Sequence, residues 1–179
     1  MKYTDIPPGY ALKAAQAGHI PFLNAIELAA AAMFPPGSIP AHILADRVPE
    51  STLMAAMRDG TLWVVLDADA RPVGYGLLQF VGGLALLAQL DVPPDHGRKG
   101  LGTALIARIV EAARERGAEF LYLTTFTHVA WNAPFYAKLG FAEIPEAEQP
   151  CAIRDILAEE KARGLENRAA MRLRPASPS

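Results

Sequence analysis

Cysteine is almost absent from this sequence, because Cys151 is the one cysteine among 179 residues. A disulfide framework within the chain is therefore excluded, and a reducing cytoplasm is the expected setting. Long hydrophobic runs are also lacking: the longest, Leu28 to Phe34, is far too short to span a bilayer. The N-terminal stretch MKYTDIPPGY has no apolar core of the signal-peptide kind. We therefore expect a soluble cytoplasmic protein that does not contact membranes.

An excess of positive charge is missing as well. The formal net charge is −2, which argues against general binding of nucleic acid.

The chain has no Walker phosphate loop, which would require GxxxxGK followed by Ser or Thr. His19, His42, His96 and Cys151 show no metal-ligand spacing, so no metal is expected.

The hydrophobic share of 51% is enough for a folded core, and we expect a single domain over residues 1–179. Its core is expected at about 9–174, with flexible termini. Strand and helix signals alternate without interruption, which favours an α/β or α+β sheet with helices on its faces. Strands are predicted at 9–15, 61–66, 73–81, 84–92, 120–126, 141–144 and 169–173, and helices at 20–33, 49–57, from the 95–100 stretch to 116, 131–139 and 153–163.

A glycine-rich stretch opens the helix that ends at 116. Arg98 and Lys99 precede Gly100 and Gly102, in the order strand, turn, RKGLG, helix. The first turn of a helix has free backbone N–H groups and partial positive charge, and glycine lets a bulky anion approach them closely. The sequence therefore predicts a phosphate-binding turn. A Rossmann fingerprint fits poorly, because Leu105 stands where the third glycine or alanine is required. A simple glycine turn before a capped helix is the alternative.

Two blocks together resemble the GNAT superfamily of acetyl-CoA-dependent N-acetyltransferases. LDVPPDHGRKGLGTALI resembles its acyl-CoA signature, and WNAPFYAKLGF, at 131–141, resembles its later motif. The resemblance implies a mixed, mostly antiparallel sheet of six to seven strands, with helices on both faces and splayed central strands. It also implies transfer of an acetyl group from acetyl-CoA to a primary amine of a small molecule or peptide, by direct attack in a ternary complex.

The resemblance also implies roles for particular positions. The backbone of the strand end would pair with the pantetheine arm, the N–H groups of the glycine turn would hold the pyrophosphate, and an asparagine would contact the CoA arm. Gly97 stands where the family has Gln or Arg. The implied cofactor-binding residues are Leu90, Asp91, Val92, Gly97, Arg98, Lys99, Gly100, Leu101, Gly102, Thr103 and Asn132.

Catalysis needs a proton donor for the leaving thiolate and an acceptor for the proton of the amine. Tyr136 lies in the second block and is the expected general acid, since tyrosine is protonated at neutral pH. An alkylammonium must lose a proton before it attacks. His128 and Glu27 are the candidate bases. Asp91 is the one carboxylate on the central strand, and its place near the strand end argues against a strand-borne base.

The resemblance also implies that the first two helices and the loop between them, here about Phe22 to Leu53, shape the acceptor pocket, with Glu27 and Phe34 among its residues. Its mostly apolar character suggests a small or partly apolar amine. Two other interpretations remain open: a catalytically weak acyl-CoA sensor or assembly subunit with the same fold, and a protein that binds another nucleotide. Either a monomer or a homodimer is compatible with the sequence.

Overall fold

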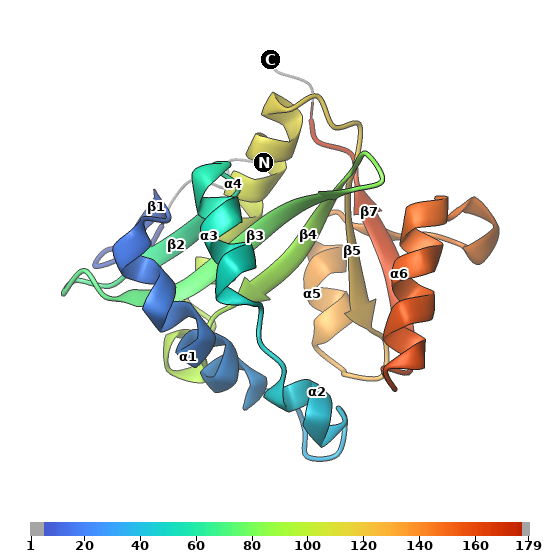
Figure 1. The fold of residues 1–179 in the computed structure, drawn as a ribbon, viewed down its shortest axis with the longest axis horizontal. Helices are drawn as coiled ribbons and strands as arrows, with labels where there is room; N and C mark the ends of the chain where they lie inside the picture. Colours follow the sequence, from blue (N-terminus) through green and yellow to red (C-terminus); the bar gives the residue numbers. More distant parts are fainter. Residues whose placement is uncertain (1–5, 177–179) are drawn as a thin grey trace.

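The computed structural model describes residues 6–176, and the expectation of flexible ends falls partly outside this range. These residues form a seven-stranded sheet in the order β1-β2-β3-β4-β5-β7-β6 (Figure 1). The strands are β1 (Ala11–Ala14), β2 (Leu62–Leu66), β3 (Pro72–Val81), β4 (Leu84–Asp91), β5 (Leu121–Phe126), β6 (Ala142–Glu143) and β7 (Arg168–Leu173). The helices are α1 (Ile20–Ala31), α2 (Ala41–Ala45), α3 (Glu50–Arg58), α4 (Leu101–Glu115), α5 (Asn132–Lys138) and α6 (Cys151–Ala162), with short 3₁₀ turns at Ala17–His19, Pro94–His96 and Glu146–Glu148.

The strands β4 and β5 separate in the middle of the sheet. They are the one parallel pair among the strand pairings, and they pair only at Ala85 with Leu121 and at Leu86 with Tyr122. Beyond these two positions the strands diverge toward their C-terminal ends (Figure 1). The mixed, mostly antiparallel sheet with splayed central strands is thereby confirmed.

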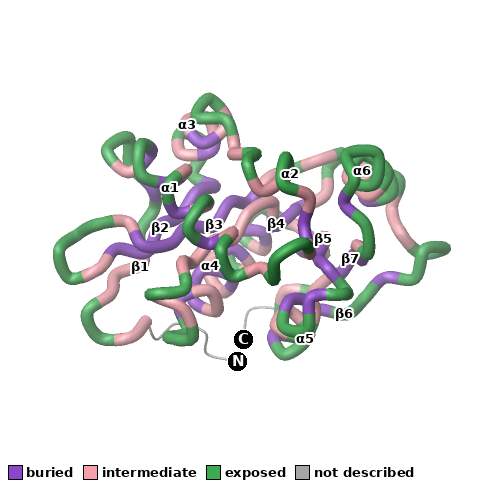
Figure 2. The backbone as a smooth tube through the Cα atoms, turned by 90° about the horizontal axis from the view of Figure 1, so that it is seen from below, coloured by how far each residue is buried: buried purple, intermediate pink, exposed green. Residues whose placement is uncertain are grey.

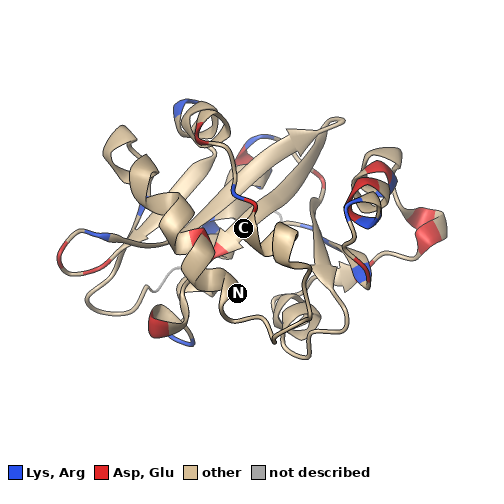
Figure 3. Ribbon diagram, turned by 60° about the horizontal axis from the view of Figure 1, so that its bottom comes forward, with Lys and Arg blue, Asp and Glu red and all other residues tan. Residues whose placement is uncertain are grey.

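Helices cover both faces of the sheet. One face packs against α1, α3 and α6, and the other packs against α4 and α5. The middle of the sheet is accordingly buried, whereas the outer faces of the helices are exposed (Figure 2). Charged side chains are concentrated on α6 at one end of the molecule, while α1 is almost free of them (Figure 3).

The packing of α4 on β3 depends on a glycine. A Cβ atom at Gly76 would lie 2.7 Å from the Ile109 Cδ1 atom and 3.6 Å from the Leu105 Cβ atom. Hydrogen in place of a side chain therefore lets α4 lie directly against the sheet. This close contact fixes the position of the whole helix, including its N-terminus.

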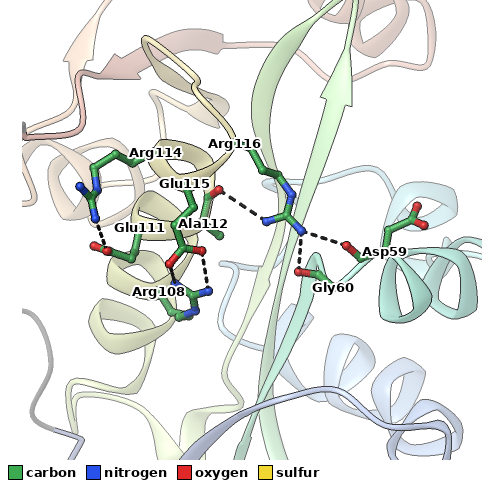
Figure 4. Close-up of polar contacts among 8 residues, drawn as sticks. All are labelled: Asp59, Gly60, Arg108, Glu111, Ala112, Arg114, Glu115 and Arg116. Atoms are coloured by element: carbon green, nitrogen blue, oxygen red, sulfur yellow. Dashed lines mark hydrogen bonds and ion pairs between the residues drawn. The ribbon is translucent and has the colours of Figure 1, made fainter.

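The C-terminal end of α4 is tied to the turn between α3 and β2. The Arg116 guanidinium donates to the backbone oxygens of Asp59 at 2.9 Å and Gly60 at 3.1 Å (Figure 4). Along the exposed face, Arg108 pairs with Glu115 at 3.0 Å. Basic side chains near a helix C-terminus also interact favourably with the helix dipole. The Arg116 contacts hold α4 at the end remote from the glycine turn.

The predicted elements agree with the structure except at a few boundaries. The first helix ends at Ala31 and not at Met33, because the chain tightens into i→i+3 bonds such as Phe34 N to Ala31 O at 3.2 Å. The helix α2 was not predicted, since five residues following Pro40 are too short for a periodic signal. The predicted strand 141–144 is reduced to the two residues of β6 at the sheet edge.

Candidate active site

A cavity of about 1540 Å³ occupies the space between the diverging strands. This volume exceeds the roughly 300–1,000 Å³ typical of a pocket for one small ligand. One wall consists of the glycine turn and the start of α4, and the other contains residues of α1, the segment between α1 and α3, and the end of β5. The cavity therefore has room for two ligands that meet near the ends of β4 and β5.

The glycine turn has the geometry of an anion site. Gly100 precedes α4 with φ of 83°, a left-handed conformation that suits glycine. The first backbone bond of the helix is Ala104 N to Gly100 O at 3.0 Å, so the preceding N–H groups of Leu101, Gly102 and Thr103 face away from the helix body. These three residues line the cavity, as the sequence predicts for a pyrophosphate contact.

The two basic residues before Gly100 differ in their roles. Arg98 is exposed, lines the cavity and itself adopts a positive φ of 57°. Lys99 instead folds back, donating to the Tyr10 hydroxyl at 3.1 Å and to the Asp95 backbone oxygen at 3.0 Å. The Lys99 side chain therefore fastens the turn, and of the two side chains only that of Arg98 lines the cavity.

The departure from the family pattern at Gly97 has a local explanation. A Cβ atom at Gly97 would lie only 3.1 Å from the Pro94 backbone oxygen. The 3₁₀ turn Pro94–His96 brings that oxygen close, and any larger residue would push against it. A glutamine or arginine at this position would thus strain the turn, and Arg98, one residue later, takes the place beside the cavity.

A β-bulge in β4 decides which side chains enter the site. The register places Leu78 opposite Leu87 and Leu77 opposite Gln89, which leaves Ala88 as an extra residue. Before the bulge Leu87 packs on the α4 side, whereas after it Leu90 does so. The alternation of side chains is therefore reversed beyond Ala88. As a result, Gln89 and Asp91 point to the opposite face, toward α1.

A polar cluster forms there around Glu27 of α1. The Gln89 side-chain amide donates to Asp91 Oδ2 at 2.7 Å and to Glu27 Oε1 at 3.3 Å. Glu27 Oε2 accepts from the Val48 backbone N–H at 3.1 Å and from the Tyr75 hydroxyl at 3.5 Å. Two carboxyl groups are thus held side by side on one wall of the cavity.

The environment of this cluster favours protonation of the carboxyl groups. Burial, opposed by the hydrogen bond from Gln89 and reinforced by the charge of Glu27, raises the pKa of Asp91 to about 7. Burial also raises the pKa of Glu27, although its hydrogen bond from Val48 opposes the change. The pKa of the Tyr75 hydroxyl is raised by burial and by both carboxylates, so it stays protonated. Asp91 consequently titrates near neutrality, as a general base requires.

Tyr136 faces the same space from α5. It lines the cavity, and its ring packs against Phe135 and Phe141 with centroid separations of 5.2 and 5.9 Å. Burial, and next the charge of Asp91, raise the pKa of Tyr136 to about 12. The hydroxyl is therefore protonated at neutral and moderately alkaline pH, and Asp91 is near enough to influence its pKa.

The structure brings some predicted residues to the cavity and leaves others aside. Leu90, Asp91, Val92, Gly97, Glu27 and Phe34 all line it. Asn132 lines it too, but its side-chain oxygen accepts a hydrogen bond from Thr125, which ties α5 to β5. His128 is not among the cavity-lining residues of the described chain; its Nε2 donates to the Ser38 backbone oxygen at 3.0 Å. His128 is therefore poorly placed to act as a base.

Sequence reasoning missed the roles of Gln89 and Tyr75 and set Asp91 aside. Both missed residues belong to strands whose pattern reads as continuous apolar core. The glutamine within LALLAQLD was the available signal, because a polar residue in a buried strand requires a partner. The partners of this glutamine could be identified only from the structure, because the bulge decides the face to which its side chain points.

Within residues 6–176, no three His, Cys, Asp or Glu side chains are grouped so that they could hold a metal ion. In the same range, no helix has the length and apolar character needed to cross a membrane.

The sequence comparison gives the family of the chain. Residues 27–141 match the model described as the acetyltransferase (GNAT) family. The chain belongs to this family.

Among curated proteins, the chain is similar to the [ribosomal protein bS18]-alanine N-acetyltransferase of Salmonella typhimurium, with 31% identity over 94 residues. The match covers 52% of this chain and 64% of that relative. A mycothiol acetyltransferase of Clavibacter sepedonicus is 39% identical over 74 residues, which are 41% of this chain and 23% of the relative. The matches thus span less than two thirds of these relatives.

Solved structures share the fold at low sequence identity. The PaiA N-acetyltransferase of Thermoplasma acidophilum, in complex with coenzyme A, superposes with a TM-score of 0.72 at 12% identity, covering 92% of this chain and 98% of that one. The N-acetylglutamate synthase of Neisseria gonorrhoeae, complexed with coenzyme A and N-acetyl-glutamate, gives 0.71 at 19% identity, covering 94% and 35%.

Proposed function

We propose that the protein is an N-acetyltransferase that moves an acetyl group from acetyl-CoA to a primary amine within a ternary complex. The observation that carries this proposal is the continuity of the cavity from the glycine turn to the Asp91 carboxyl. The turn offers backbone N–H groups to a phosphate, and the carboxyl titrates near neutrality. The family and the coenzyme A complexes of structural neighbours support it.

The residues of the cavity fit acetyl-CoA in two respects. The N-terminus of α4, with Arg98 beside it, suits the pyrophosphate. The edge of β4 beyond Leu86, which has no strand partner on the β5 side in the described structure, suits the amide-bearing pantetheine arm. When bound there, acetyl-CoA supplies a thioester carbonyl that is open to attack by an amine.

The chain then supplies two proton transfers. The Asp91 carboxylate accepts the proton that the ammonium must lose, and the new N–C bond forms as the C–S bond breaks. The Tyr136 hydroxyl donates its proton to the leaving sulfur and is restored by the second proton, which the nitrogen loses as the amide forms. Glu27 keeps the Asp91 pKa high through its charge, while Gln89 orients both carboxyl groups. Asp91 replaces His128 as the proposed base, since it lies in the cavity and is coupled electrostatically to Tyr136.

The test combines binding with turnover. Acetyl-CoA at a hundredfold excess over its Kd should stabilise the fold by about 2.7 kcal/mol in a thermal-shift measurement, whereas ATP and NAD should not. An amine panel with thiol detection should then show acceptor-dependent release of CoA. Stabilisation without release from any amine would instead support an acyl-CoA sensor, and absence of stabilisation at millimolar acetyl-CoA would exclude both functions.

A further inference from the structure

The acceptor side of the cavity is closed by one segment of the chain, residues 34–46, here called the crossing segment. It contains α2 and connects the α1 side of the sheet to the β5 side. In Figure 1, α2 lies beyond the diverging ends of β4 and β5, between α1 and α6. Several of its residues line the cavity, including Phe34, Ile39, Ile43 and Leu44.

Polar contacts fasten the crossing segment to the far side of the gap. His42 Nε2 donates to the Arg163 backbone oxygen at 2.9 Å, at the end of α6. His128 Nε2 donates to the Ser38 backbone oxygen at 3.0 Å, from the loop after β5. The Arg163 side chain also forms an ion pair with Asp46. These three contacts span the opening at separate points.

An apolar cluster also holds the crossing segment in place. Ile39 is buried together with Phe126, Val129 and Leu165, which belong to β5, the loop after it and the turn before β7. Phe34, Ile43 and Leu44 pack against this cluster. Ile39 is buried, and Phe34, Ile43 and Leu44 are partly buried, so apolar contacts hold the crossing segment in place. The crossing segment therefore lies across the acceptor end of the cavity and is held at its β5 side.

The charges at the acceptor end of the cavity favour a cation. Arg163 is paired with Asp46, and Arg168 is paired with Glu160 at 2.9 Å and stacked on Phe126. Two carboxyl groups, Glu27 and Asp91, remain on the other wall.

A further cation, Arg47, lines the cavity near these two carboxyl groups. Its guanidinium donates to the backbone oxygens of Leu44, at 2.7 Å, and Asp46, and its charge lowers the pKa of both Glu27 and Asp91. One guanidinium therefore faces two carboxyl groups. A bound ammonium would supply a second positive charge beside the two carboxyl groups. A bound carboxylate would instead lie close to Glu27 and Asp91, which carry charge of the same sign.

We propose that the acceptor is a small alkyl or arylalkyl amine without a carboxylate, whose apolar body lies against Phe34, and not an amino acid or the N-terminus of a protein. This inference rests on the proposed acetyl transfer. Phe34 contributes an aromatic wall together with Phe126 and Trp131, at ring separations of 5.7 and 5.3 Å. A polypeptide acceptor would have to pass the crossing segment, which is tied to the β5 side through His128 and Ser38.

Matched acceptors test the proposal on the full chain with saturating acetyl-CoA. The pairs are phenethylamine against phenylalanine and isoamylamine against leucine, with an alanine-initiated hexapeptide as the third class. We expect kcat/KM for each amine to exceed that of its amino acid by about a hundredfold or more, since like charges placed together cost several kcal/mol. The peptide should give no thiol release above background.

Amino acids or the peptide reacting within tenfold of the amines would overturn the proposal. So would failure of every amine in the panel, and the acetyl-transfer function would fall with it only if no acceptor of any class released CoA. A variant pair isolates the wall: Phe34→Ala should lower kcat/KM for phenethylamine about tenfold or more, and far less for ethylamine. Phe22→Ala is the matched control, because Phe22 is 52% exposed and lies outside the cavity lining. Equal losses for the two amines in Phe34→Ala would contradict the assigned contact.

Discussion

The Gln89 side-chain amide lies 2.7 Å from the Asp91 carboxylate because the two residues are two positions apart in β4 and share one face. The same amide reaches Glu27 on α1. Gln89 therefore joins two carboxyl groups that would otherwise repel each other, and it does so from the rigid strand next to the reaction space.

The first prediction concerns Asp91 as the base. Its pKa of about 7 means that kcat at saturating amine should rise through neutral pH and then level off. Asp91→Asn should remove this inflection and lower kcat by roughly 10²–10⁴. The measurement is a pH–kcat profile beside Asp69→Asn, a control in the exposed turn before β3. Persistence of the inflection in Asp91→Asn would assign it to another group.

A second prediction concerns stability. Between the ordinary pKa of 3.8 and about 7, folded Asp91 binds more protons than unfolded Asp91. The slope of the unfolding free energy with pH from this group is therefore negative, so its contribution is lost as pH rises through that window. Asp91→Asn should gain stability relative to the wild type between pH 4.5 and pH 8 in urea titrations. A difference that stays constant over this range would show that the carboxyl is not perturbed.

The third prediction tests Gln89 as a positioning residue. Its hydrogen bond lowers the Asp91 pKa against the effect of burial. Gln89→Leu should therefore shift the inflection of the kcat profile to higher pH, while acetyl-CoA affinity stays near the wild-type value. A merely structural role would reduce kcat at all pH values without moving the inflection. Restoration of the wild-type profile by Gln89→Asn would show that the amide is sufficient at shorter reach.

The fourth prediction separates Tyr136 as an acid from Tyr136 as packing. Tyr136→Phe should lower turnover by roughly 10²–10⁴ with little change in acetyl-CoA affinity. Because its pKa lies at about 12, the wild-type enzyme should show no loss of activity near pH 9, although an ordinary tyrosine would predict one. Wild-type turnover in the Phe variant would leave Tyr136 a packing residue between Phe135 and Phe141.

The fifth prediction compares the backbone and the side chain of the glycine turn. Gly100→Val should weaken CoA binding more than Arg98→Ala, as measured by calorimetry. A Cβ atom at Gly100 meets nothing within 4 Å in the protein, but φ of 83° disfavours any larger residue. The branched side chain would also fill space that the ligand needs. Greater loss in Arg98→Ala, with both variants folded, would identify the guanidinium as the main anchor.

Much of the predicted candidate site rests on short sequence motifs. The glycine turn and Tyr136 were found from the sequence because each depends on residues adjacent in the chain. The face to which Asp91 points was not predictable, since simple alternation from Leu87 places it on the α4 side. The extra residue at Ala88 reverses this, and only the pairing with β3 shows it. The contact of His128 could not be predicted for a similar reason, because its partner Ser38 is 90 residues away.

The short pairing of β4 with β5 leaves two strand edges facing each other inside the described structure. Exposed strand edges invite pairing with other chains and so promote aggregation. Here the crossing segment closes one side of the gap by its contacts with the β5 side, and Asn132 ties α5 to β5 through Thr125. The wall that sizes the acceptor thereby also keeps an interrupted sheet from adding strands of another molecule.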